Sequence, residues 1–124
     1  MSKLTEERRI RRSDDRFVAL RYQLEHTRGQ AGIEALVLAD DTGLVVASSG
    51  DAAVCAELGA VAPLISRSFM GVPMPPLLRS ADVAVRRVEV LGQELFLACT
   101  GGGVARDAHL RSSLNGVTRI LAAN

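Results

Sequence analysis

The stretch Gly32 to Gly50, GIEALVLADDTGLVVASSG, decides the fold that we predict for this chain. Its first part, IEALVLA, is an apolar run of strand length, which predicts a buried strand over Ile33–Ala39. The next residues, Asp40–Gly43, are typical of a tight turn, because glycine adopts a positive φ at little cost. Leu44–Ala47 is apolar again, so the two strands are predicted to form an antiparallel hairpin.

A helix is predicted before this hairpin and another after it. In the leading helix, Ser13 is a good capping residue, although no glycine or proline would prevent a start near Thr5. A proline at position 63 removes one backbone donor from the second helix and predicts a kink or a break there. The apolar stripes at helical spacing are Phe17, Leu20 and Leu24 in the first helix, ended by Gly29 and Gln30, and Val54, Leu58, Val61 and Ile65 in the second.

The second half of the chain predicts two more strands and a last helix. Three prolines make Met70–Ser80 a loop, because proline lacks the donor that regular elements need. Strands follow over Asp82–Val90 and Glu94–Thr100, joined by a turn at Leu91–Gln93. The last helix begins near Asp107, and its glycine, Gly116, predicts close packing of helix on sheet. Its apolar stripe is Leu110, Leu114, Val117 and Leu121.

Composition limits the class of protein. The chain has 124 residues, 48% of them hydrophobic, which fits one domain. It has no apolar run long enough to cross a membrane and no apolar leader region at its start. Two cysteines far apart, Cys55 and Cys99, predict buried reduced thiols and a cytoplasmic protein.

The charge is unevenly distributed along the chain. Met1–Arg28 holds eight Lys or Arg against five Asp or Glu, whereas the remainder is slightly acidic. We expect residues 1–12 to be a basic, flexible segment and residues 13–124 to be a single domain. Arg8–Arg16 could contact nucleic acid or anionic lipid, but nearby acids and few aromatics favour a solvated helix start.

No residue pattern indicates catalysis, a cofactor or a metal site. The glycines at 101–103 lack the lysine and the spacing of a phosphate-binding loop, so a structural turn is favoured. His26 and His109 have no companions at ligand spacing. The adjacent carboxylates Asp40 and Asp41 are typical of turn chemistry. We therefore expect a protein that is not an enzyme and that has no nucleic-acid partner.

The second helix is apolar nearly all round, which distinguishes it from the other two. One stripe is explained by burial under the sheet of the same chain. The opposite small-residue face either tolerates solvent or contacts a partner helix, and partner contact is slightly favoured. The small residues in question are Ala53, Ala56, Ala60 and Ala62.

The leading helix, the Gly32–Gly50 hairpin, the Ala/Leu-rich helix and the terminal strand and helix together resemble the roadblock/LC7 family. The likeness covers roughly residues 14–123, and the hairpin is its most specific part. It implies an α+β fold, a three-layer α/β/α sandwich of profilin-like type with a mainly antiparallel sheet. The expected element order is α-β-β-α-β-β-(β)-α with four to five strands, since the family normally has five.

The resemblance also implies a function. Roadblock/LC7 proteins form homodimers or heterodimers and act without a cofactor as scaffolds or regulators of small Ras-like GTPases or of dynein. Bacterial members regulate a polarity GTPase in gliding bacteria. We therefore expect a cytoplasmic homodimer that binds a small Ras-like GTPase or a paralogous roadblock protein, in cell polarity or motility. The dimer face implied for this chain is Val54, Leu58, Val61, Ile65, Val83, Val85 and Arg87.

An alternative from another class is a small-ligand sensor. Three-layer folds of the profilin, PAS or GAF type can enclose a ligand on the sheet. The few aromatic residues and the lack of converging polar groups argue against that alternative.

Overall fold

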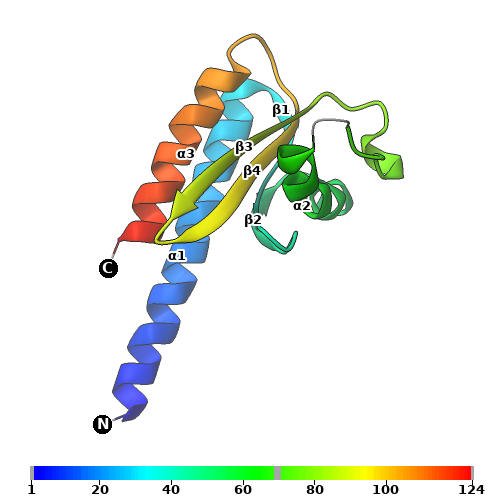
Figure 1. Cartoon of the computed structure of the whole chain (residues 1–124). Helices are drawn as coiled ribbons and strands as arrows, with labels where there is room; N and C mark the ends of the chain where they lie inside the picture. The colour runs from blue at the N-terminus through cyan, green and yellow to red at the C-terminus, as the bar shows by residue number, and fades with distance from the viewer. Residues whose placement is uncertain (1, 69–70, 124) are drawn as a thin grey trace.

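The hairpin predicted from Gly32–Gly50 forms one half of a four-stranded antiparallel sheet (Figure 1). The computed structural model describes residues 2–68 and 71–123, with side chains from residue 15 onward. The sheet order is β2-β1-β4-β3. The elements are α1 (Ser2–Ala31), β1 (Ile33–Asp40), β2 (Val45–Ser49), α2 (Ala52–Arg67), the short 3-10 helix η1 (Pro76–Leu78), β3 (Val83–Val90), β4 (Gln93–Gly101) and α3 (Arg106–Ala122).

The central strand β1 is apolar and buried over Ala35–Ala39, because both faces of the sheet are covered there. Successive side chains of a strand point to opposite faces. Leu36 and Leu38 pack in a core with α1 and α3, whereas Ala35 and Val37 pack in a second core under α2. Figure 1 shows α1 and α3 on one side of the sheet and α2 on the other. The predicted three-layer α+β sandwich is confirmed.

Helices α1 and α3 lie side by side across one face of the sheet. Leu24 of α1 and Leu110 of α3 are both fully buried in that core. At Gly116, an added Cβ would collide with the Gln23 side chain of α1, so the close packing is between two helices. The sequence predicted that α3 packs closely on the sheet at this glycine. The structure shows that the close neighbour is α1 instead.

Helix α1 is longer than the apolar stripe indicated. It begins at Ser2, well before the predicted cap at Ser13, and ends at Ala31, where Gly32 has a φ of 65°. Figure 1 shows its first turns extending beyond the sheet and beyond the end of α3. The flexibility expected of residues 1–12 stays a prediction, as does the domain boundary after them.

Helix α2 is continuous across its proline. Asp51 caps its first turn, because the carboxylate accepts a hydrogen bond from the Val54 amide at 3.0 Å. The helix then runs to Arg67 with Pro63 inside it, so the break is wrong, and the alternative that the sequence allowed, a kink, stays a prediction. The side chain of Pro63 is buried, and its packing retains the helical path despite the missing donor.

The described residues form four strands, and the segment between α2 and β3 is a loop with no fifth strand in its described part. It contains η1, and Leu78 is buried beneath α2. The backbone N–H of Leu77 donates to the Glu57 carboxylate of α2 at 3.0 Å. These contacts hold the loop against one flank of α2, beside the core that α2 shares with the sheet.

Candidate protein-interaction face

The side of α2 that faces the sheet contains most of the residues expected at a dimer face. Leu58 is fully buried and Val61 is 7% exposed, both packed against the sheet. Val54 and Ile65 are half-buried at the margin of the same core. The inner stripe of α2 therefore packs against the sheet within the single chain, and its contact with a second copy stays a prediction. Helical spacing shows which residues share a face but not what covers it.

Strand β3 supplies the remaining residues of the expected dimer face. Val83 and Val85 are half-buried against the core under α2, and Arg87 is exposed. The structure thus brings Val83 and Val85 together with the inner stripe of α2, but as one core. Because β3 ends the sheet order, one side of its backbone has no strand partner among the described residues.

An arginine covers part of that free edge. Arg86 donates from Nη1 to the Val85 carbonyl at 3.1 Å and from Nη2 to Asp107 of α3 at 2.8 Å. The Val85 carbonyl points away from β4, because it accepts from this side chain. A charged side chain over an edge strand limits pairing with another chain until it moves aside.

The outer side of α2 is a stripe of exposed, mostly small residues. Their spacing of three or four positions places them on one face of the helix. Leu64, 53% exposed, is the only large apolar side chain among them. Small side chains let a second helix approach closely, because the distance between packed helices depends on the residues at their contact. This outer stripe consists of Ala53, Ala56, Ala60, Leu64 and Arg67.

Ala62, which the sequence had grouped with the small residues, does not belong to the outer stripe. Its side chain is fully buried in the core under α2. Gly59 is buried as well, and an added Cβ there would lie 2.6 Å from Val45 Cγ2 of β2. Small residues therefore lie on both sides of α2: Gly59 and Ala62 face the sheet, and the alanines of the outer stripe are exposed.

A charged cluster lies where α2 ends over the sheet. Glu94 of β4 pairs with Arg67 at 3.1 Å and with Arg87 of β3 at 3.6 Å. The Arg67 guanidinium carbon also lies 5.6 Å from the centroid of the Phe96 ring. Sequence reasoning missed Arg67 and Glu94, because they are distant in the chain and only the fold brings them together.

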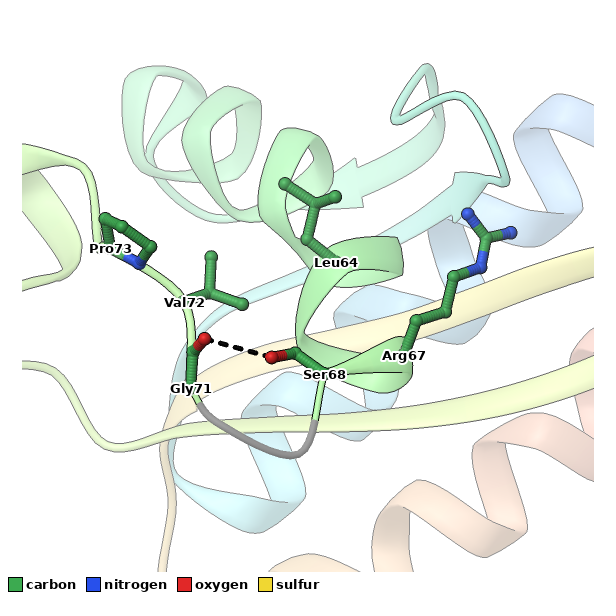
Figure 2. Close-up of a pocket in the computed structure, with 6 residues that line it drawn as sticks. All are labelled: Leu64, Arg67, Ser68, Gly71, Val72 and Pro73. Atoms are coloured by element: carbon green, nitrogen blue, oxygen red, sulfur yellow. Dashed lines mark hydrogen bonds between the residues drawn. The ribbon is translucent and has the colours of Figure 1, made fainter.

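A hollow of about 470 Å³ opens beside this cluster, between the end of α2 and the loop that follows. Figure 2 shows Leu64 on α2 and Val72 and Pro73 on the loop around it. Ser68 Oγ donates to the Gly71 carbonyl at 2.9 Å, which ties the two walls together. The α2-end hollow, as we name it, is lined by Leu64, Arg67, Ser68, Gly71, Val72 and Pro73.

The other residues considered from the sequence lie in a turn or in the two cores of the chain. Asp40 Oδ1 accepts hydrogen bonds from the Thr42 amide, the Thr42 hydroxyl and the Leu44 amide, as expected of a turn. The Thr42 hydroxyl bond is the main cause that lowers the pKa of Asp40. Cys55 and Cys99 are buried free thiols, and burial raises the pKa of each. Their predicted burial is confirmed.

Within residues 2–68 and 71–123, no three His, Cys, Asp or Glu side chains are grouped so that they could hold a metal ion. In the same part of the chain, no helix is both long and apolar enough to cross a membrane.

Comparison with known proteins connects the fold to solved structures. No protein-family model and no curated protein matches the sequence. Myxococcus xanthus MglB is similar with a TM-score of 0.51 and 12% identity, over 85% of this chain and 89% of that chain. The gliding protein MglB of Thermus thermophilus has a TM-score of 0.51 and 16% identity, over 85% of this chain and 90% of that one. Likeness at such identities shows the fold, and the expected architecture is confirmed.

Proposed function

We propose that this chain, which has the roadblock/LC7 fold, is a non-enzymatic scaffold that binds a second copy of itself and a small Ras-like GTPase or a paralogous roadblock protein. The observation that carries the proposal is the exposed outer stripe of α2. A helix whose inner face is already buried gains nothing within its own protomer from an apolar outer face. That face is therefore available for a partner.

Self-association through α2 agrees with the geometry of the helix. The helix has 16 residues and is about 24 Å long, with Ala60 near its middle. In an antiparallel pair centred on Ala60, Arg67 of one copy approaches the Ala53 end of the other, where Asp51 of the partner subunit caps the helix. Opposite charges would then meet at both ends of the helix pair.

The free edge of β3 can enlarge such an interface. A stable protein interface buries about 1,200 Å² or more, which two short helices alone rarely supply. Pairing of β3 with its copy would add backbone hydrogen bonds and continue the sheet. This step requires Arg86 to release the Val85 carbonyl, to which it donates in the single chain.

We place this role in the cytoplasm, in bacterial gliding motility or cell polarity. The Thermus thermophilus protein is described as a gliding protein. No residue of this chain is assigned to acceleration of GTP hydrolysis. The proposal is restricted to self-association through the outer stripe of α2 and to regulation by partners that bind the dimer so formed.

Binding to purified Ras-like GTPases of the source organism tests the proposal. Isothermal titration would compare each GTPase, loaded with GDP or a GTP analogue, against the wild type and two arginine variants. Ala56→Arg places a long charged side chain in the outer stripe, and Ala108→Arg makes the same change at an exposed site on α3. We expect binding to be lost in Ala56→Arg and retained in Ala108→Arg. Equal binding by both variants would contradict the proposed surface.

A further inference from the structure

The backbone groups on the free edge of β3 can be assigned residue by residue. The Asp82 carbonyl accepts a hydrogen bond from the Gly101 amide of β4 at 2.9 Å, and the register of β3 with β4 then continues without a shift. In an antiparallel pair, the backbone groups of alternate residues point to opposite sides of the strand. The Val85 carbonyl agrees with this alternation, because it accepts from the Arg86 side chain instead of from β4. The residues whose backbone groups point away from β4 are therefore Val83, Val85, Arg87 and Glu89.

Two charged side chains on this edge lack a full partner of opposite charge within their own chain. Arg87 lies 3.6 Å from Glu94, but that carboxylate already accepts a hydrogen bond from Arg67 at 3.1 Å. Glu89 lies directly opposite Glu94 in the sheet register, where like charges disfavour each other. Among the described residues, Glu89 forms no ion pair. Both Arg87 and Glu89 are exposed, so each can gain an oppositely charged partner from another molecule.

The spacing of these two charges makes the edge complementary to itself. Arg87 and Glu89 lie on the same face of β3, because side chains of a strand alternate between the faces. In an antiparallel pair of identical strands, the residues on either side of the two-fold axis exchange places. With the axis at Val88, each Arg87 therefore lies opposite Glu89 of the partner subunit, and this ion pair occurs twice.

Other registers are less favourable. An axis at Arg86, Arg87 or Glu89 would place that charged residue directly opposite its own copy. An axis at Val85 would use the Val85 carbonyl of both copies, and Arg86 already donates to that oxygen. An axis nearer the start of β3 would pair only its first few residues. With the axis at Val88, the central hydrogen bonds join Arg87 and Glu89, so Arg86 has to move only for the outermost pair.

We propose that β3 pairs with β3 of a second copy about a two-fold axis at Val88, with Arg87 of each copy bound to Glu89 of the partner subunit. This inference rests on the self-association proposed above and specifies which residues determine the register. The order arginine, valine, glutamate matches itself when the second strand runs in the opposite direction. The same order disfavours an edge strand with other charges at these positions, so it selects a second copy of this chain as the partner.

Disulfide crosslinking of the full chain tests the register. In the proposed pair the two Val88 Cα atoms are about 4.5 Å apart, within the range that a disulfide spans, whereas the two Val85 positions are about 20 Å apart. Mild oxidation should therefore join Val88→Cys into a covalent dimer and leave Val85→Cys uncrosslinked. Ala108→Cys, at an exposed site on α3, measures random collision, and the wild type measures the background from the buried Cys55 and Cys99. Crosslinking of Val85→Cys as fast as that of Val88→Cys would overturn the inference.

Charge reversal tests the ion pairs. Arg87→Glu places two glutamates opposite each other at both ends of the axis, and Glu89→Arg places two arginines there. We expect each variant alone to dimerise at least tenfold more weakly than the wild type in sedimentation equilibrium. An equimolar mixture of the two should return to the wild-type affinity, because every glutamate then meets an arginine. Arg111→Glu, an exposed change of the same kind on α3, should dimerise like the wild type.

The outcomes separate the register from the association itself. Circular dichroism would establish that each variant is folded. A dimeric wild type without a Val88→Cys crosslink, or a mixture that dimerises no better than its components, would overturn the register and leave the proposed self-association intact. A monomeric wild type would contradict that self-association, and the inference with it.

Discussion

Replacement of Leu58 by alanine should destabilise the protomer strongly, because the structure places this side chain inside the core under α2. Leu58 is fully buried with Val37 and Phe96 of the sheet. Its truncation removes three carbons, which cost about 0.8 kcal/mol each in lost burial. The cavity left behind adds to this cost, so we expect a loss of about 3 to 4 kcal/mol in the free energy of unfolding.

Leu64→Ala is the matched control, because it is the same substitution on the same helix at a side chain that is 53% exposed. It should cost less than about 1 kcal/mol of protomer stability. Urea denaturation followed by circular dichroism would measure both variants. Measurements at two fixed protein concentrations would separate protomer stability from association, since association makes the transition concentration-dependent. A cost for Leu58→Ala no greater than that for Leu64→Ala would refute the assignment of the inner stripe to the core.

Three further predictions concern other parts of the chain. Because the Thr42 hydroxyl lowers the pKa of Asp40 below its ordinary 3.8, this carboxylate stabilises the fold above the unfolded pKa and loses that effect as pH falls through the folded one. Melting temperatures below about pH 4 should therefore fall more steeply in wild type than in Asp40→Asn, and parallel curves would argue against it. Burial raises the pKa of Cys55 and Cys99, so Ellman's reagent should label the native chain slowly at neutral pH and the unfolded chain rapidly; fast native labelling would show that the thiols are accessible. Gly50 has a φ of 115° and an added Cβ would lie 2.7 Å from the Glu34 carbonyl oxygen, so Gly50→Ala should cost about 2 kcal/mol or more in urea denaturation, whereas Gly29→Ala, in open space on α1, should be neutral or stabilising.

Local patterns in the sequence were sufficient to predict the four strands and the three helices, whereas the layers were implied by the resemblance to the roadblock/LC7 family. The apolar run of β1, the turn at Asp40–Gly43 and the stripe of α2 each reflect a single element. At Pro63 the local rule allowed a kink or a break, and the helix does not break, since the buried proline packs within a continuous α2. Gly116 correctly indicated a close approach, but the neighbouring element could not be identified from one helix alone.

The expected dimer face stays a prediction, because α2 is apolar on both sides and the sequence does not show which side the sheet covers. Leucine, valine and isoleucine at helical spacing suggested a contact face, and the fold uses that face for its own core. The small residues of α2, which we considered as a partner face from the sequence, are exposed, with the exception of the buried Ala62. The pairing of Arg67 and Arg87 with Glu94 joins three elements and has no signal in the sequence.

Sedimentation equilibrium of the wild type beside Ala60→Arg and Ala108→Arg tests the central proposal, association through the outer stripe of α2, most directly. Ala60 lies at the middle of that stripe, and Ala108 is an exposed control on α3. We predict a dimer for the wild type and for Ala108→Arg, and a folded monomer with an unchanged circular dichroism spectrum for Ala60→Arg. A wild type that sediments as a monomer, or an Ala60→Arg variant that remains a dimer, would contradict the account.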